Sequence, residues 1–212
     1  MIESKADYRF YLEADRLALS KTTRRPTLEE DIWRFQRLLR KVEYYKNCKP
    51  SPVHRPYLKS LYLRIWLLGR KLGYTIPPNT FGPGLCIAHR GTIVVHVNSR
   101  IGENCRIHAD TNIGTEARYD NRAPRIGSNV FIGPGAKIFG DIVLGDDVAV
   151  AANAVVNRSF EASHQTLGGV PAKKISDRGT EGLLVRATEE LRGGRATGSM
   201  ATEGPRPTTR TP

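Results

Sequence analysis

The chain has 212 residues, of which 39% are hydrophobic and 25% charged, with a formal net charge of +12. This composition is typical of a globular protein and excludes a wholly disordered chain, and the length allows a buried core without disulfide bonds. The sequence contains no apolar run near the ~20 residues of a membrane span, and its start, MIESKADYRF, lacks the apolar stretch of a secretory signal. Cys48, Cys86 and Cys105 show no metal-ligand spacing. We therefore predict no disulfide framework, no metal site and a cytoplasmic protein.

The positive charge is concentrated in the N-terminal third. Residues 1–75 contain 17 Lys and Arg against 8 Asp and Glu, whereas residues 76–175 contain 10 against 8. A basic face attracts nucleic acid, anionic lipid or a phosphorylated small molecule, although an ordinary solvated surface explains the charge equally well. The chain has no recognised nucleic-acid motif, so we predict no nucleic-acid partner and leave contact with a membrane surface open.

Three helices are predicted at the start of the chain. Apolar residues recur at roughly helical spacing in 5–20, and Thr27 with Glu30 forms a capping-box pattern that predicts the start of a second helix. In that second helix, one buried face is marked by Ile32, Phe35, Leu38, Leu39 and Val42. A third helix is expected over 57–71, before a glycine. We predict an α-helical domain over residues 1–74.

The middle of the chain repeats every six residues. The apolar positions of this repeat are Val95, Ile101, Ile107 and Ile113 and, after an interruption, Ile126, Ile132, Ile138, Leu144, Val150 and Val156. A fixed hexad is the signature of a parallel β-helix, in which each hexad is a short strand with a corner and about 18 residues make one triangular coil. The interruption at 114–125 is polar, and we interpret it as a loop that leaves the coil and carries function.

The end of the chain differs again in composition. Residues 193–212 are rich in Gly, Thr, Arg and Pro and have almost no large apolar side chains. Such a segment buries too little apolar surface to fold by itself. The prediction is an α+β protein, with a β-helix over 75–176 and a mostly disordered tail over 177–212; a short helix within 180–191 stays open.

Several segments of the repeat resemble a known family. The segments FGPGLCIAHRGTIVV, RIGENCRIHADTNIG, PRIGSNVFIGPGAKIFGDIVLGDDVAVAANAVV and LGGVPAKKI resemble the hexapeptide-repeat acyltransferases. The likeness is greatest to the serine O-acetyltransferase branch, which includes relatives in capsule and exopolysaccharide biosynthesis. This resemblance implies a left-handed β-helix, a homotrimer, and O-acetyl transfer with acetyl-CoA as a co-substrate and no bound cofactor. The acceptor would be a hydroxyl of a small molecule or a glycan.

The resemblance also suggests which residues carry the reaction. An alcohol is a poor nucleophile until a base takes its proton, and histidine is the usual base near neutral pH. His89 lies in IAHRGT, which matches the catalytic-histidine motif of the family, so we predict that His89 is the base. His108 and Arg122 are predicted to contact the acceptor. For His108, the alternatives are a contact with the trimer neighbour and a surface histidine. For Arg122, the alternative is a solvated loop arginine.

The donor side of the family motif is better preserved. The closing segment GGVPAKK and the small residues of the preceding coils match the groove that holds the pantetheine arm. By this resemblance, CoA is predicted to contact Ala136, Ala154, Gly168, Gly169, Lys173 and Lys174. The two lysines would pair with CoA phosphates, and ordinary surface lysines are the alternative.

Three positions depart from the serine acetyltransferase pattern. Ala88 and Thr75 stand where the family has aspartates, and Ala123 stands where it has a histidine. These changes favour a sugar hydroxyl in surface-polysaccharide biosynthesis over L-serine. They also leave a backbone carbonyl, Asp110 or Glu116 to orient His89. The alternative from another class is a non-catalytic trimeric scaffold that docks through its basic helices.

Overall fold

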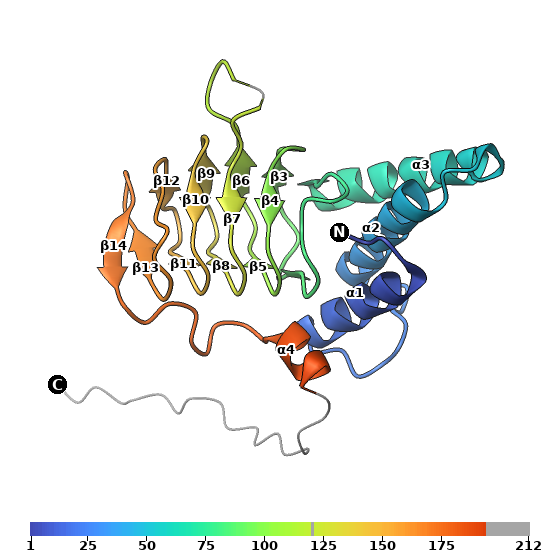
Figure 1. Ribbon diagram of the computed structural model, residues 1–212, viewed down its shortest axis with the longest axis horizontal. Coiled ribbons are helices and arrows are strands. Elements are labelled where there is room, and N and C mark those ends of the chain that lie inside the picture. Colours follow the sequence, from blue (N-terminus) through green and yellow to red (C-terminus); the bar gives the residue numbers. More distant parts are fainter. Residues whose placement is uncertain (120, 194–212) are drawn as a thin grey trace.

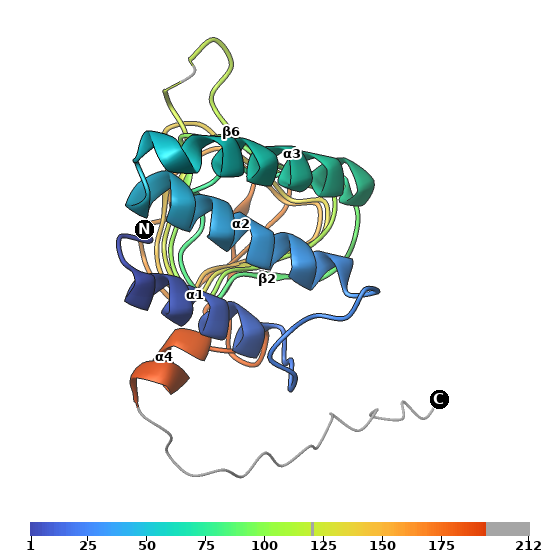
Figure 2. The same ribbon diagram turned by 90° about the vertical axis from the view of Figure 1, so that its right-hand side faces the viewer.

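The computed structural model describes residues 1–119 and 121–193, which form a layer of helices at one end of a three-sided coil (Figure 1). The helices are α1 (Lys5–Ala18), α2 (Asp31–Cys48), the short 3-10 helix η1 (Pro52–His54), α3 (Arg55–Leu72) and α4 (Ala187–Arg192). Viewed along the coil, α1, α2 and α3 lie side by side across its end (Figure 2). No helix in these described ranges is long and apolar enough to cross a membrane.

The coil is built from short strands that stack turn upon turn. These strands are β1 (Tyr74–Thr75), β2 (Cys86–Ile87), β3 (Ile93–Val95), β4 (Arg100–Ile101), β5 (Arg106–Ile107), β6 (Thr111–Gly114), β7 (Arg125–Ile126), β8 (Phe131–Ile132), β9 (Lys137–Phe139), β10 (Val143–Leu144), β11 (Ala149–Val150), β12 (Val155–Val156), β13 (Thr166–Gly168) and β14 (Lys173–Ser176). They form three sheets in the orders β1-β3-β6-β9-β12, β10-β7-β4 and β14-β13-β11-β8-β5-β2. Every described pairing is parallel except that of β13 with β14. The coil is a left-handed parallel β-helix, and the predicted fold class is confirmed.

The six-residue repeat identifies the core of the β-helix. Ile107, Ile132 and Val150 lie in register on adjacent strands and have no exposed surface. All of the apolar hexad positions from Val95 to Val156 are 5% exposed or less. Burial of these aliphatic side chains in vertical stacks is the main stabilising contribution, at about 1.5–3 kcal/mol for each fully buried side chain.

The corners between sheets explain the polar residues inside the repeat. Asn104, Asn129 and Asp147 occupy equivalent corners and have φ values of 53°, 57° and 57°. Asn and Asp tolerate this left-handed conformation better than most residues because their short side chains form local hydrogen bonds. The Asn104 Nδ2 atom also donates to Asn129 Oδ1 at 2.8 Å, which links two coils.

The helices form close to the predicted ranges, with one difference at the start of α2. The helix begins at Asp31, four residues after Thr27, although the capping-box pattern predicts an earlier start. The Glu30 carboxylate does accept a hydrogen bond from the Thr27 backbone N–H at 2.8 Å, and it pairs with Lys21 at 2.7 Å. The Thr27–Glu30 contact therefore closes a turn that precedes α2 and does not cap the helix itself. Gly73 ends α3 with φ of 84°, the left-handed conformation common at helix ends.

Polar side chains of α2 complete the edge of the first coil. β2 is an edge strand, so its outer N–H and C=O groups have no neighbouring strand. The Gln36 amide takes the place of that strand: its Nε2 donates to Leu85 O at 2.6 Å, and its Oε1 accepts from Ile87 N at 3.1 Å. This contact fixes β2 against the helical layer.

A buried charged cluster joins α1, α2 and the first coil. The Arg40 guanidinium donates to Asp15 at 2.8 Å and to Glu43 at 3.0 Å, and it also reaches the carbonyl of Phe81 at 2.9 Å. Burial raises the pKa of Asp15, and the charge and hydrogen bonds of Arg40 oppose that rise. Because Arg40 has this many hydrogen-bond partners, few polar atoms of the buried cluster lack a partner.

The segment after the β-helix returns along the coil to the helical layer (Figure 1). Thr188, in α4, is fully buried, and its hydroxyl accepts from Asn104 Nδ2 at 2.8 Å. Arg192 forms an ion pair with Glu103 at 2.6 Å. Residues 177–193 of the predicted tail thus pack against the coil, and residues 194–212 lie outside the described residues.

Candidate active site

His89 lies just beyond β2, on the first coil and next to the helical layer. Its side chain is exposed, and its backbone carbonyl accepts a hydrogen bond from the Tyr74 hydroxyl at 2.8 Å. The following residue, Arg90, pairs with Asp31 of α2 at 3.3 Å. The backbone around His89 is therefore held by the helical layer and by β1, while its imidazole is free to meet a ligand.

His108 is the nearest ring to His89. It follows β5 on the next coil, and the centroids of the two imidazoles are 5.7 Å apart. On its other side, the His108 ring packs against Phe131 with centroids 5.0 Å apart. The predicted base and one predicted acceptor contact are thus brought together, in a column of rings on one face of the coil.

The environment of His108 favours its neutral form. Burial lowers the pKa of His108 below the ordinary 6.5, and the charge of Arg106 and the adjacent His89 lower it further. Arg106 Nε also donates to His108 Nε2 at 3.4 Å, which leaves Nδ1 as the protonated nitrogen of the neutral ring. A neutral His108 therefore places no positive charge beside the His89 ring.

None of the predicted orienting carboxylates reaches His89. Among the described residues, no side chain hydrogen-bonds the His89 imidazole. Glu116 pairs with Arg122 at 3.2 Å within the loop, and Ala88 has no polar side-chain atom to offer. In a single chain, His89 is positioned by its backbone and by the neighbouring His108 ring.

The loop between β6 and β7 holds the third predicted residue. Arg122 is exposed, and its guanidinium stacks over the Tyr119 ring at 3.9 Å from the centroid. Arg122 and Glu116 line a cavity of about 420 Å³ together with Phe139 and Asp141. This cavity lies on a different side of the coil from β2 and β5, so one chain does not bring Arg122 to His89.

The predicted donor residues lie at the opposite end of the sheet that carries His89. Gly168 ends β13, and Lys173 and Lys174 lie on β14, the outermost strand. Five strand spacings of about 4.8 Å separate β2 from β14, or roughly 24 Å along the coil. Both lysines are exposed, and Lys174 also pairs with Asp177.

Small residues connect these two ends. The register of the sheet aligns His108 with Gly133, Ala151 and Gly168 on successive strands. A Cβ on Gly168 would approach Ile175 Cδ1 to 2.9 Å, so a larger residue would crowd this strip. These residues form a strip of small side chains between the histidines and the lysines, in which Gly133 and Gly168 are buried and Ala151 is partly exposed.

Ala136 and Ala154 do not lie on this strip. Both side chains point into the core and have no exposed surface. They keep the coil narrow, and any contact with a donor would have to come through their backbone. Gly169, by contrast, is exposed and has φ of 96° at the corner before β14.

Sequence reasoning missed three residues that shape the site, namely Tyr74, Arg106 and Phe131. The signal for two of them was present in the repeat. Arg106 and Phe131 directly precede inward apolar residues of adjacent coils, and the hexad register stacks such outward positions. The contact of Tyr74 with His89 depends on how α3 enters the coil, which no local pattern shows.

Within residues 1–119 and 121–193, no group of three or more His, Cys, Asp or Glu side chains is placed to hold a metal ion. Cys86 and Cys105 are buried, and burial raises the pKa of each thiol. These cysteines pack as small residues in the coil.

Comparison with known proteins links the coil to a described family. The family described as "Bacterial transferase hexapeptide (six repeats)" matches residues 123–158. A protein of Helicobacter pylori described as serine acetyltransferase is 32% identical over 103 residues, which are 48% of this chain and 60% of that protein. The chain therefore spans about three fifths of the length of this curated relative.

Solved structures show the same architecture. Soybean serine acetyltransferase complexed with serine is 25% identical, with a TM-score of 0.66 over 81% of this chain and 70% of that one. Serine acetyltransferase from Brucella abortus in complex with coenzyme A has a TM-score of 0.63 at 24% identity, over 81% of this chain and 67% of that one. The second likeness shows a shared fold.

Proposed function

We propose that the chain is a hexapeptide-repeat protein of the serine acetyltransferase type and that it transfers an acetyl group from acetyl-CoA to a hydroxyl. The observation that carries the proposal is the pairing of an exposed His89 with a neutral His108 at one end of a strip whose other end bears lysines. The named activity of the relatives supports the same reaction.

The reaction requires one base and no covalent intermediate. His89 removes the proton of the acceptor hydroxyl, and the oxygen attacks the thioester carbonyl. The carbon–sulfur bond then breaks, and the CoA thiolate takes the proton from the His89 imidazolium. Proton transfer of this kind contributes about 10²–10⁴-fold to the rate.

The alignment of small residues between the histidines and the lysines supports an elongated donor. With the thioester at His89, the donor lies along the strip of Gly133, Ala151 and Gly168. Its phosphates then reach Lys173 and Lys174, roughly 24 Å away by the strand spacing. A serine acetyltransferase of this fold is named as a complex with coenzyme A, which supports acetyl-CoA as the donor.

A homotrimer would complete the site. Arg122 and its cavity lie on a different side of one chain from His89, so a neighbouring copy is the simplest source of an acceptor contact. Trimers with sites between subunits are what the family resemblance implies. Analytical ultracentrifugation should therefore show a species of about three chains.

Two acceptors compete for this site. L-serine is favoured by the relatives, whose names specify serine. A sugar hydroxyl is favoured by Arg122, which is paired with Glu116 and stacked on Tyr119, and so offers no unpaired charge to a serine carboxylate. Ala88 and Ala123 add no polar side chain for serine either.

Thiol release from acetyl-CoA tests the proposal. The protein is assayed with L-serine and with a panel of nucleotide sugars and glycans. His89→Asn should lower kcat by about 10²–10⁴-fold with the true acceptor. His164→Asn is the matched control, because His164 is an exposed histidine on another corner of the coil. Full turnover by a folded His89→Asn protein would exclude His89 as the base.

The donor end is tested separately. Replacing Lys173 and Lys174 by glutamine should raise KM for acetyl-CoA while kcat stays near the wild-type value, because both lysines contact phosphates far from the thioester. If calorimetry shows no acetyl-CoA binding to the wild-type protein, the non-catalytic scaffold becomes the better description.

A further inference from the structure

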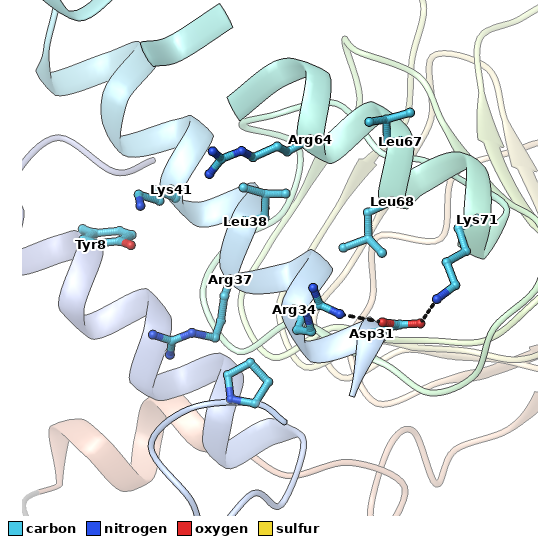
Figure 3. Close-up of a pocket in the computed structure, with 11 residues that line it drawn as sticks. Tyr8, Asp31, Arg34, Arg37, Leu38, Lys41, Arg64, Leu67, Leu68 and Lys71 are labelled. Carbon is cyan, nitrogen blue, oxygen red and sulfur yellow. Dashed lines mark hydrogen bonds and ion pairs between the residues drawn. The ribbon is translucent and has the colours of Figure 1, made fainter. Parts of the chain in front are cut away.

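A basic groove crosses the outer face of the helical layer, away from the β-helix (Figure 3). It has a volume of about 660 Å³ and is lined by α2 and α3, with Tyr8 of α1 at its side. The floor is partly apolar, with Leu38 and Leu68. Five cations surround it: Arg34, Arg37, Lys41, Arg64 and Lys71.

The acid in this lining, Asp31, is already neutralised. Its carboxylate pairs with Lys71 at 2.7 Å, with Arg34 at 3.1 Å and with Arg90 at 3.3 Å. The hydrogen bond from Lys71, together with the charges of these cations, lowers the pKa of Asp31, so it stays ionised. Asp31 therefore cannot offset the remaining cations.

The other three cations are available to a ligand. In the described part of the chain, Arg37, Lys41 and Arg64 form no ion pair. Arg37 lies over the Trp33 ring and Lys41 over the Tyr57 ring, which leaves their charge uncompensated. Three like charges around one groove repel each other, and an anion relieves that repulsion.

The exposed ridge of α3, formed by Leu63, Trp66, Leu67 and Arg70, borders this groove. Leu63, Trp66 and Leu67 are 56%, 54% and 53% exposed, and the Arg70 guanidinium lies 4.7 Å from the Trp66 ring centroid. The whole of α3, from Arg55 to Leu72, contains five Lys and Arg and no acidic residue. Apolar and aromatic side chains beside cations are typical of helices that lie in a membrane interface.

We infer that the groove and the α3 ridge together bind the surface of a bilayer that contains anionic phospholipids. The phosphates would occupy the groove, and Leu63, Trp66 and Leu67 would enter the headgroup region. A soluble phosphate would satisfy the groove alone and leave the ridge without a partner. A second copy of this face would bring five further cations and no acid on α3, so like charges oppose self-association. This inference does not depend on the proposed acetyl transfer.

Vesicle binding by the full chain tests the inference. The protein is floated with phosphatidylcholine vesicles and with vesicles that also contain phosphatidylglycerol. We expect binding to the anionic vesicles, and weaker binding as salt screens the charges. The double variant Arg37→Gln/Arg64→Gln should weaken binding by on the order of 10- to 30-fold, since each cation near an anionic surface contributes about 1 kcal/mol. Arg158→Gln/Arg178→Gln is the charge-matched control on the β-helix end and should change binding less than about twofold.

Tryptophan fluorescence gives a second readout. The chain has two tryptophans, and Trp33 is 1% exposed whereas Trp66 is 54% exposed. Anionic vesicles should shift the emission to shorter wavelength, and Trp66→Phe should abolish that shift while the thiol-release activity is unchanged.

Three outcomes would overturn the inference. The first is equal binding to neutral and anionic vesicles, or none to either. The second is calorimetric binding of inorganic pyrophosphate that Arg37→Gln/Arg64→Gln removes while vesicles have no effect, which would indicate a soluble phosphate ligand. The third is a shift in Trp66 emission that follows protein concentration rather than lipid, which would indicate contact between copies.

Discussion

The β-helix and the helical layer bury very different side chains. In the β-helix, one aliphatic residue per hexad points inward, and Ile113, Ile132 and Ile138 have no exposed surface. In the helical layer, the buried set includes Arg40, which is fully buried beside Asp15. The coil is thus stabilised by repetition of one small contact, whereas its junction with the helices depends on a few polar groups with specific partners.

This difference has a consequence for mutations. A change in the repeat removes one contact among many equivalent ones. A change at the junction leaves a buried charge or backbone group without its partner, and that penalty is larger than the loss of a methyl group. We therefore expect the junction to be the more sensitive region, although it is the smaller one.

The largest loss of stability is expected for Arg40→Met. Without the guanidinium, Asp15 and Glu43 are buried without a counter-charge, and the free energy of unfolding should fall by about 3–5 kcal/mol. Urea unfolding followed by circular dichroism measures it. Arg37→Met on the same helix is the control and should stay within about 0.5 kcal/mol. Similar losses for both variants would show that the buried cluster of Arg40, Asp15 and Glu43 contributes no more to stability than Arg37 does.

A smaller loss is expected for Gln36→Leu, which keeps the volume of the side chain but removes its amide. Leu85 O, just before the edge strand β2, and Ile87 N, within it, would then lose their partners. The expected cost is about 1–3 kcal/mol. In the Gln36→Leu variant, the Ile87 amide should exchange its hydrogen faster than in the wild-type protein. The amides of central strands, such as that of Ile132, should be less affected. Unchanged protection of Ile87 would mean that Gln36 does not complete the edge.

In the repeat itself, Ile132→Val should cost only about 0.5–1.5 kcal/mol, because it removes one methylene from a buried stack. Ile175→Val is the matched control, since Ile175 is 63% exposed. The same urea series measures both variants. A loss at Ile132 that exceeds the loss for Gln36→Leu would reverse the expected ranking of coil and junction.

The smallest effect concerns pH at His108. Its pKa is lowered in the folded protein, so as pH falls below 6.5 the unfolded chain takes up a proton before the folded one does. Stability should therefore fall with pH in that range, and His108→Gln should remove part of the fall. Melting temperatures on both sides of pH 6.5 measure it, with His164→Asn as control. An identical pH dependence in wild type and His108→Gln would contradict the lowered pKa.

Much of the fold could be predicted because the β-helix is locally encoded. Each hexad repeats the same inward residue, so Val95, Ile107 and Val150 indicate the core without any knowledge of distant contacts. Helix ranges were predictable for the same reason. The start of α2 was not, because Glu30 pairs with Lys21 across the preceding loop, and that pairing depends on where α1 ends.

The candidate site was predictable only in part. The resemblance indicated His89 and His108, and the register brings them within 5.7 Å of each other. It also suggested Ala136 and Ala154 as donor contacts, whose side chains face the core. A small residue in the repeat can face either the core or the outer surface of the coil. The residue type alone therefore does not show whether an alanine lines an outer groove or packs in the core.

By itself, the sequence determined the period of the coil, the residues of its core and the excess of positive charge near the N-terminus. Only the tertiary structure decided that Gln36 completes β2, that Arg106 and Phe131 enclose His108, and that Arg37 and Arg64 meet in one groove. The physical reason is regularity. The inward residues stack between coils at a fixed spacing, so their period is visible in the chain, whereas these polar contacts join segments whose approach depends on how the helices pack against the coil.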